Sequence, residues 1–309
     1  MSSIWITGAN GFIGRHLARH LHSAGHRVHG IGHGQWPTLE ATAWGIDHWM
    51  NSEIDASGLD ALLRLGGLPD RIFHLAGGSS VGASLANPHE DFARTVSTSA
   101  RLLEWVRHNA RDARVVAASS AAVYGSSCEG QIGEDVPTRP YSPYGHHKLM
   151  MEQVCRSYSE AFGVHCTIVR LFSVYGPWLR KQLLWDMCSR VHAGADHLRL
   201  GGSGNELRDW VEITDVVRML ECASTQECDP MLLVNGGTGR GTPVSRIASL
   251  VVDAWARDIP VTFTGEARPG DPISLIARPS VLHSWGLASR VRVEDGIAGY
   301  VRWFQKAQA

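Results

Sequence analysis

The chain has 309 residues, with 29 basic and 30 acidic side chains and a formal net charge of −1. This balance argues against binding of nucleic acid or of an anionic membrane surface, because both require a basic face. Hydrophobic residues make up 44% and charged residues 19% of the chain, as in an ordinary globular protein of one large domain or two coupled ones.

Short apolar runs alternate with helical patterns in the first half of the chain. The runs are rich in apolar and β-branched residues and lie at positions 3–7, 27–31, 71–75, 114–119 and 164–170. Such runs are typical of strands that are covered on both faces. The sequence therefore predicts a parallel sheet whose strands are connected by helices.

Amphipathic patterns predict these connecting helices. Apolar residues recur every four positions over 13–21, and the pattern stops at Gly25, as a helix with a glycine stop would. The longest other helices are expected at 91–108 and 143–162, the second after Ser142 as its N-cap. Repeated strand–helix–strand units predict an α/β fold with a right-handed, doubly wound parallel sheet.

The regular alternation of strand and helix patterns ends after the apolar run at 164–170. Turn-rich segments such as 236–241 then separate shorter elements. We expect residues 1–175 to form the main sheet domain and residues 176–309 a smaller C-terminal lobe, with a return to the sheet near 231–235. Ligands of open α/β sheets bind at the carboxyl ends of the strands, so we expect the site at that edge.

The sequence shows no pattern typical of export, membrane insertion or metal binding. The N-terminal residues lack a basic segment followed by a long apolar core, and no run reads as a membrane-spanning helix. The six cysteines contain no C-x-x-C pair, and the 16 histidines are dispersed. We therefore expect reduced thiols, no metal site and a cytoplasmic location.

A glycine-rich turn follows the first predicted strand and leads directly into a helix. Glycines in this position allow a tight turn and let backbone N–H groups at the helix N-terminus approach a pyrophosphate. A glycine pattern in this context is typical of a dinucleotide site. The residues expected to contact the dinucleotide are Gly8, Asn10, Gly11, Phe12, Ile13 and Gly14.

The second predicted strand bears on the choice of cofactor. In such folds this strand usually ends in an acid that binds the adenosine ribose and selects NAD. Here the strand continues into Gly32 and His33, and no acid is present at its end. Gly32 leaves room for a 2′-phosphate, while His33 and Arg15 offer donors or positive charge. The sequence therefore favours NADP over NAD.

Seven segments occur in order along the chain. They are TGANGFIG, HLAG (74–77), SSAAVYG (119–125), SPYGHHK (142–148), RLFSVYGP (170–177), LRDWVEITD (207–215) and RPGD (268–271). Together they resemble the extended short-chain dehydrogenase/reductase superfamily, in particular its nucleotide-sugar epimerase, dehydratase and reductase group, over nearly the whole chain. The resemblance implies a Rossmann-like dinucleotide domain with cofactor contacts from Leu75, Ala76 and Gly77, and a C-terminal lobe that binds a nucleoside-diphosphate sugar.

The catalytic residues expected are Ser120, Tyr144 and Lys148. Tyr144 and Lys148 are four residues apart near the start of a helix, so they share one face. A nearby ammonium favours the phenolate, which makes a tyrosine usable as an acid or base. The resemblance further implies that Lys148 holds the nicotinamide ribose and that Ser120 hydrogen-bonds the reacting sugar oxygen. We interpret the adjacent pair His146 and His147 as a solvated helix face.

Two alanines narrow the reaction. The 4,6-dehydratases of this group place Asp and Glu directly after the active hydroxyl residue, whereas this chain has Ala121 and Ala122. Methyl groups cannot transfer protons, so dehydration is disfavoured. Decarboxylation is disfavoured too, because decarboxylases commonly keep a glutamate at the second position. Hydride transfer at one carbon remains.

The substrate-binding residues follow from the resemblance. Arg208 and Arg268 belong to motifs whose arginines bind the nucleotide diphosphate, a role suited to guanidinium groups. Asp271 would accept a hydrogen bond from the nucleotide ribose. Ser173 replaces an asparagine usual in the family, so its contacts to the diphosphate are altered.

These observations predict NAD(P)-dependent oxidoreduction at C4 of a nucleoside-diphosphate hexose. The missing ribose acid favours a 4-ketoreductase that uses NADPH over a 4-epimerase that keeps NAD bound. A non-catalytic dinucleotide sensor is a further alternative, disfavoured by the intact set of Ser120, Tyr144 and Lys148.

A homodimer is also expected. Members of this group commonly pair the two long helices, here 91–108 and 143–162, into a four-helix bundle. The apolar contacts that these helices offer are Phe92, Trp105, Met151 and Tyr158.

Overall fold

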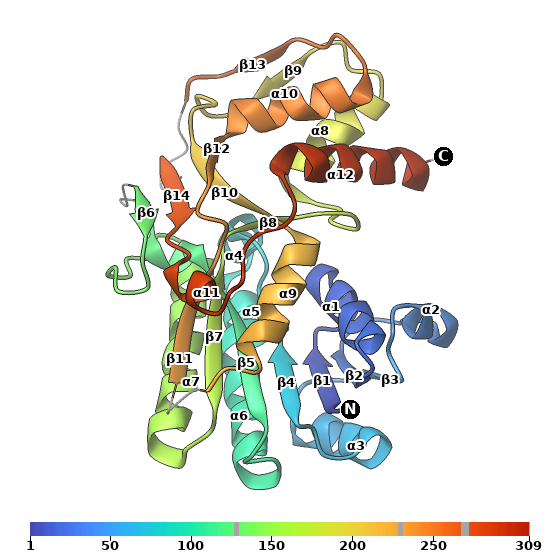
Figure 1. Ribbon diagram of the computed structural model, residues 1–309, viewed down its shortest axis with the longest axis vertical. Helices are drawn as coiled ribbons and strands as arrows, with labels where there is room; N and C mark the ends of the chain where they lie inside the picture. The colour runs from blue at the N-terminus through green and yellow to red at the C-terminus, as the bar shows by residue number, and fades with distance from the viewer. Residues whose placement is uncertain (127–129, 228–230, 267–271, 309) are drawn as a thin grey trace. The chain divides into compact units, whose positions relative to one another are not determined.

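The structure is a computed structural model that describes residues 1–126, 130–227, 231–266 and 272–308 (Figure 1). The chain divides into two compact units, each built from three segments. Unit 1 comprises Met1–Tyr124, Pro137–Leu171 and Val217–Val234. Unit 2 comprises Gly125–Val136, Phe172–Val216 and Asn235–Ala309.

Unit 1 contains a seven-stranded sheet in the order β11-β7-β5-β4-β1-β2-β3 (Figure 1). The pairings from β7 to β3 are all parallel, which confirms the predicted Rossmann-like, doubly wound sheet. The strand order reverses between β1 and β4, where Thr7 of β1 lies opposite Ile31 on one side and His74 on the other. This reversal is the place where open α/β sheets bind ligands. The strands are β1 (Ser3–Thr7), β2 (Arg27–Gly32), β3 (His48–Asn51), β4 (Arg71–His74), β5 (Arg114–Ser120), β7 (Cys166–Leu171) and β11 (Met231–Gly236).

Helices cover the sheet of unit 1. One hydrophobic core cluster joins Trp5 and Val115 of the sheet to Leu62 of α3, Leu102 of α6 and Met151 of α7, so these three helices pack on the same face of the sheet. The helical elements are α1 (Phe12–Ser23), α2 (Thr38–Ala43), α3 (Ala56–Gly66), α4 (Val81–Ala86), α5 (Pro88–Phe92), a π-helical turn (Ala93–Ser97), α6 (Thr98–Asn109), a 3-10 turn (Ala121–Tyr124) and α7 (Pro143–Phe162). Helix α9 (Ile213–Ala223) has residues in both units.

The two long predicted helices differ in outcome. The helix at 143–162 is confirmed as α7: Ser142 Oγ accepts a hydrogen bond from Gly145 N at 3.2 Å, and Gly163 ends the helix with φ 68°. The single helix expected at 91–108 is wrong in detail, since the segment is divided among α5, the π-helical turn and α6. An additional residue in a helical turn of this kind often marks a functional position.

Unit 2 contains two smaller sheets. Its five-stranded sheet has the order β12-β10-β14-β6, and β8 pairs with β10; β9 and β13 form a separate pair. The strands are β6 (Gln131–Ile132), β8 (Ser173–Tyr175), β9 (Leu198–Leu200), β10 (Leu207–Glu212), β12 (Gly241–Pro243), β13 (Val261–Phe263) and β14 (Ser274–Ala277). The helices are α8 (Gln182–His192), α10 (Val244–Trp255), α11 (Ser280–Ser284) and α12 (Val293–Gln308).

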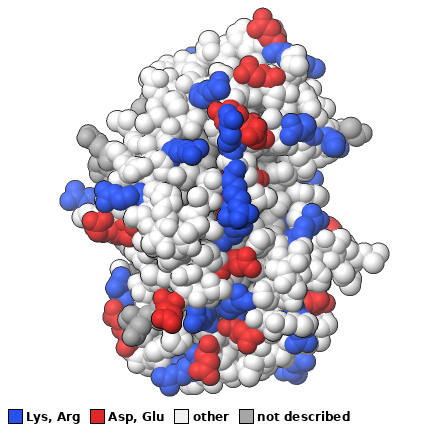
Figure 2. Space-filling model, viewed as in Figure 1, with Lys and Arg blue, Asp and Glu red and all other residues white. Residues whose placement is uncertain are grey.

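The described residues show how charge is distributed on the surface and whether they contain a membrane-spanning helix or a metal-binding cluster. Basic and acidic side chains are interspersed on the face shown in Figure 2. Within the described residues, no helix is long and apolar enough to cross a membrane, and no three His, Cys, Asp or Glu side chains gather in a way that would hold a metal ion.

Candidate active site

The glycine-rich turn between β1 and α1 fits a pyrophosphate. Gly8 has φ 72°, and a Cβ on it would lie 2.9 Å from the Ala76 backbone nitrogen. A Cβ on Gly14 would lie only 2.4 Å from the Gly8 carbonyl oxygen. The first-turn amides of α1 have no partner within the helix, so they can bind an anion. The turn thus has the shape and polarity that a dinucleotide requires.

The HLAG segment connects this turn to the catalytic helix. Leu75 N donates to the Thr7 carbonyl oxygen at 3.2 Å, and Ala76 N donates to Thr7 Oγ1 at 3.3 Å. A Cβ on Gly77 would lie 3.4 Å from Lys148 Nζ. The expected cofactor-binding residues Leu75, Ala76 and Gly77 therefore lie between the glycine turn and Lys148.

The carboxyl ends of β2 and β3 lie side by side at the expected adenosine end of the site. Gly34 N donates to Asn51 Oδ1 at 3.1 Å, and His33 Nε2 lies 3.5 Å from Glu53 Oε1. The end of β2 carries no acid, and Glu53, just after β3, places a carboxylate beside it. The sequence prediction overlooked Glu53 because it did not include β3; the signal for it was the short run at 48–51 with an acid two residues after its end.

Arg15 is engaged by groups of the protein. Its Nη2 donates to the Asn10 carbonyl oxygen and to Asn10 Oδ1, both at 2.9 Å. Its Nη1 lies 3.8 Å from Glu40 Oε1, and its guanidinium lies 5.5 Å and 5.2 Å from the ring centroids of Trp36 and Trp44. Glu40 offsets part of the positive charge of Arg15, and the bonds to Asn10 order the glycine turn.

Ser120, Tyr144 and Lys148 are brought together in unit 1. Ser120 ends β5 and Tyr144 lies in the first turn of α7, and the Ser120 side chain is near enough to Tyr144 to lower the pKa of its phenol. Lys148 Nζ lies 6.0 Å from the centroid of the Tyr144 ring. Tyr144 N donates to Ser84 Oγ at 3.0 Å, which fixes the start of α7. These contacts form the constellation expected from the sequence.

Burial is the main influence on the pKa values of Lys148 and Tyr144. Burial lowers the pKa of Lys148 to about 8, against the opposing charges of Asp91 and Glu152. Burial raises the pKa of Tyr144, the hydrogen bond from Ser120 lowers it, and the charge of Asp91 raises it further. The phenol of Tyr144 therefore holds its proton more firmly than the presence of Lys148 alone leads one to expect.

A buried network beneath the site fixes α7 to the sheet. Arg170 of β7 donates from Nε to Glu152 Oε1 at 2.9 Å and from Nη2 to Glu152 Oε2 at 2.7 Å. Ser119 Oγ donates to Glu152 Oε1 at 2.5 Å, and Arg170 Nη1 donates to the Tyr124 hydroxyl at 2.9 Å. Paired arginine–carboxylate bonds have fixed geometry, so this network sets the position of the α7 face that carries Lys148.

The histidine pair that follows Tyr144 does not form a solvated face. His146 is exposed, but His147 has only 12% of its side chain exposed and places Nδ1 2.6 Å from Asp91 Oδ2. The interpretation of His147 as solvated is therefore wrong. Asp91 lies in a different element, 56 residues earlier, so no local pattern in the sequence pointed to this contact.

The substrate-binding residues expected from the sequence lie in unit 2 or outside the described residues. Ser173 of β8 lies opposite Trp210 of β10 in a parallel pair, which places Arg208 of β10 on the strand beside it. Arg208 Nη1 donates to the Leu207 carbonyl oxygen at 2.9 Å. Arg268 and Asp271 are outside the described residues.

Comparisons with known proteins bear on the family. The model of the NAD dependent epimerase/dehydratase family matches residues 4–230. The uncharacterized UDP-glucose epimerase YtcB of Bacillus subtilis is 31% identical over 283 residues, 87% of this chain and 87% of that protein. The UDP-glucose 4-epimerase of Azospirillum brasilense is 28% identical over 295 residues, 89% and 83% of the two chains.

The fold of this chain is also similar to that of a solved structure. MoeE5 in complex with UDP-glucose and NAD is 27% identical, with a TM-score of 0.87 over 99% of this chain and 100% of that one. The match of the family model covers most of the chain, and it includes the glycine turn, the end of β5 and the Tyr144–Lys148 helix described above. On this sequence and this architecture, the chain belongs to the NAD dependent epimerase/dehydratase family.

Proposed function

We propose that this protein is an NAD-dependent epimerase that inverts the hydroxyl at C4 of the hexose of a UDP-sugar, with UDP-glucose as the substrate class to test. The observation that carries the proposal is the gathering of Tyr144, Lys148 and the Ser120 end of β5, with Lys148 Nζ 6.0 Å from the Tyr144 ring centroid and bonded to Ala118 of β5, in a chain that is similar over 89% of its length to a UDP-glucose 4-epimerase. The sequence alone favours a 4-ketoreductase, and these relatives favour the alternative 4-epimerase.

The chain supplies acid–base chemistry in this reaction. Tyr144 removes the proton of the 4-hydroxyl as C4 is oxidised and returns it as C4 is reduced, while Ser120 hydrogen-bonds the same oxygen. Lys148 stabilises the phenolate through its ammonium. The glycine turn would hold NAD, which would supply the hydride chemistry at C4. Inversion requires the 4-keto sugar to present its opposite face between these two steps.

The residues after Ser120 support reaction at C4 without elimination. Ala121 is buried and Ala122 follows it in the same 3-10 turn. Neither methyl group can transfer a proton to or from C5 or C6. The 4-keto sugar formed beside Tyr144 therefore meets no residue at these two positions that would remove water from it.

NAD rather than NADP is the proposed cofactor. The carboxylate of Glu53 near His33 provides an acceptor for ribose hydroxyls and repels a 2′-phosphate at short range. Arg15 is engaged by Asn10 and Glu40, so its charge is partly offset. The MoeE5 structure contains NAD. These observations favour NAD over the NADP preference that the sequence suggested.

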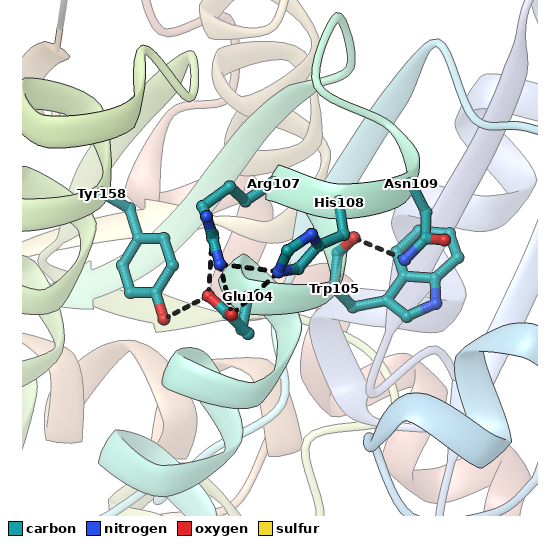
Figure 3. Close-up of polar contacts among 6 residues, drawn as sticks. All are labelled: Glu104, Trp105, Arg107, His108, Asn109 and Tyr158. Atoms are coloured by element: carbon teal, nitrogen blue, oxygen red, sulfur yellow. Dashed lines mark hydrogen bonds and ion pairs between the residues drawn. The ribbon is translucent and has the colours of Figure 1, made fainter.

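A homodimer through α6 and α7 is part of the proposal. Trp105 and Met151, two of the contacts expected from the sequence, instead pack in the core of their own unit. Phe92, Met150 and Phe162 are exposed at 39%, 45% and 39% and are the apolar contacts available. Tyr158, the fourth expected contact, has a partner within its own chain. Figure 3 shows it pointing from α7 to Glu104 of α6, whose Oε2 accepts a hydrogen bond from the Tyr158 hydroxyl at 3.0 Å.

The test is incubation of the purified protein with UDP-glucose without added nucleotide, followed by chromatography of the sugar nucleotides. The expected result is an equilibrium mixture with UDP-galactose, together with NAD in the nucleotide extracted from the protein. The Tyr144→Phe variant is the control for contaminating activity. A protein that exchanges no C4 configuration but oxidises NADPH with a 4-keto sugar nucleotide is a ketoreductase, and that result would overturn the proposal.

A further inference from the structure

A buried aspartate–histidine pair lies beside the residues expected to be catalytic. Asp91 of α5 and His147 of α7 are joined by the 2.6 Å contact between Oδ2 and Nδ1, and only 4% and 12% of their side chains are exposed. The ring of Phe92 packs edge-on against the His147 ring, with centroids 5.5 Å apart. The pair is thus shielded from water. In such a buried environment a charge acts more strongly on its neighbours than it does in water.

The position of this pair connects it to both catalytic groups. His147 directly precedes Lys148 and lies three residues after Tyr144 in α7. Asp91 packs against the loop after β4, because a Cβ on Gly78 would lie 1.8 Å from Asp91 Oδ1. Gly77, the preceding residue of that loop, adjoins Lys148 Nζ. Asp91 and His147 therefore contact the two segments that hold Lys148.

Asp91 differs from the other carboxylate that acts on Lys148. Glu152 also raises the pKa of Lys148, but both of its oxygens are bonded to Arg170, a permanent cation. The partner of Asp91 is an imidazole, which carries a positive charge only when it is protonated. The net charge of the Asp91–His147 pair is one negative charge with a neutral imidazole and zero with an imidazolium.

The remaining charged groups around the pair are few among the described residues. Helix α4, which packs on α5 and α7, has the sequence VGASLA and no titratable side chain. On α5, Glu90 pairs with Arg94 of the π-helical turn at 2.5 Å in an exposed position, and His89 is exposed. On α7, the titratable groups within five residues of His147 are Tyr144, Lys148, Glu152 and the exposed His146.

We propose that Asp91 and His147 form a positioning pair for the C4 chemistry, in which the Asp91 carboxylate, adjusted by the proton on His147, sets the charge that Lys148 and Tyr144 experience. This inference rests on the proposed function for its role in turnover. With a neutral imidazole, the Asp91 carboxylate stabilises the ammonium of Lys148 and opposes the phenolate of Tyr144. With an imidazolium the pair is neutral, and both effects disappear.

Lysine titration by NMR tests the pair directly. The chain contains three lysines, Lys148, Lys181 and Lys306, so the Cε carbon of each, which is bonded to Nζ, can be resolved in protein labelled with carbon-13 lysine, and Lys148→Arg assigns the signal. Asp91→Asn removes the negative charge and is expected to lower the pKa of Lys148 by about one unit. His147→Gln leaves the charge of Asp91 in place, so the pKa of Lys148 is expected to stay at its wild-type value or rise.

The two variants separate charge from packing. Both break the contact between α5 and α7, so a purely structural role would move the pKa of Lys148 in the same direction in both. That result, or no change in Asp91→Asn, would overturn the proposal. If Asp91→Asn does not fold, His147→Gln alone decides: a fall in the pKa of Lys148 in that variant refutes the charge role.

Neighbouring residues provide matched controls. Glu90→Gln and His146→Gln remove the same chemical groups one residue away, at the half-exposed and exposed positions described above, and are expected to leave the titration of Lys148 unchanged. The measurement needs neither NAD nor a sugar nucleotide. A protein that lacks epimerase activity therefore leaves this test intact, and a failure of this test leaves the epimerase proposal intact.

Discussion

Lys148 Nζ donates a hydrogen bond to the Ala118 carbonyl oxygen at 2.8 Å, which joins helix α7 to strand β5 two residues before Ser120. This bond holds the ammonium on the same side of the sheet as the end of β5. The relative positions of Ser120 and Lys148 are therefore fixed by backbone and side chain together, before any ligand binds.

The Tyr144→Phe variant is expected to lose turnover by a factor of about 10² to 10⁴, because the phenol oxygen is the group that transfers the proton. The bond from Tyr144 N to Ser84 Oγ uses the backbone and remains in the variant, so α7 should keep its start. UDP-galactose formation and the amount of bound NAD measure the two effects. A variant with more than a tenth of wild-type turnover would contradict the role of Tyr144.

The Gly14→Ala variant is expected to lose bound NAD. The added methyl group would lie 2.4 Å from the Gly8 carbonyl oxygen and 2.7 Å from the Ala9 Cα, so the turn has to open. The matched control is Gly82→Ala in α4, where a Cβ has no neighbour within 4 Å in the described residues and alanine is the better helix former by about 1 kcal/mol. Nucleotide extraction and thermal unfolding of both variants distinguish loss of the site from loss of the fold.

Glu53→Gln is expected to narrow the preference for NAD. The substitution removes the charge that opposes a 2′-phosphate and keeps an oxygen acceptor for the ribose. A swing of about 1 kcal/mol, roughly fivefold in the ratio of the two dissociation constants, is expected because the carboxylate is exposed and screened. Titration of NAD and NADP into protein freed of nucleotide measures it, with Glu294→Gln, at a partly exposed acid of unit 2, as the control. An unchanged ratio would show that Glu53 does not select the cofactor.

His29 makes stability depend on pH. Burial lowers the pKa of His29 from 6.5 to about 4, and among the described residues neither ring nitrogen has a hydrogen-bond partner. As pH falls, His29 therefore takes up a proton in the unfolded chain before it does so in the folded protein. The stability that the folded state owes to a neutral His29 is fully present above about pH 6.5 and is lost progressively towards pH 4. The loss is about 2 to 3 kcal/mol.

The His29→Leu variant removes this titration. Its free energy of unfolding, measured by urea denaturation from pH 7 to pH 4, is expected to fall less steeply than that of the wild type. The exposed neighbour His48, whose ring stacks on His29 with centroids 5.3 Å apart, provides the control His48→Gln. Parallel pH dependences of the wild type and His29→Leu would exclude His29 as the cause.

Met150→Arg is expected to dissociate the proposed dimer. Met150 is exposed on α7, and an unpaired charge in an apolar interface is strongly unfavourable. Leu65→Arg on α3 introduces the same charge at an exposed leucine outside the proposed interface. Light scattering at micromolar concentration compares the two variants with the wild type; a wild-type monomer, or a dimer that Met150→Arg leaves intact, rules out this interface.

Local signals in the sequence account for the parts of the fold that were predicted well. Helix α7 was predicted with its observed limits because its N-cap Ser142 and the left-handed Gly163 act within one turn of its ends. The π-helical turn was not predicted, since it forms where Thr95 Oγ1 accepts a hydrogen bond from Gly78 N at 2.8 Å. That contact joins residues 17 positions apart, and helical periodicity contains no information about it.

The same distinction applies to the site. Ser120, Tyr144 and Lys148 lie in motifs that can be read within a few residues, and the structure brings them together. Glu53 and Asp91 contact His33 and His147 across strand or helix boundaries, so a pattern read within a single element does not identify these contacts. The NADP preference relied on the end of one strand, whereas the acid comes from the strand beside it.

The segment Val217–Val234 of unit 1 has a consequence for synthesis on the ribosome. Strand β11 pairs with β7 at the edge of the sheet, yet it is made some 60 residues after β7 (positions 231 and 171). While the intervening chain is being translated, β7 is an unpaired edge strand rich in β-branched residues, the kind of edge that associates with other chains. A fragment that ends at residue 175 would keep this edge permanently, so a soluble nucleotide-binding fragment of this protein has to extend through β11.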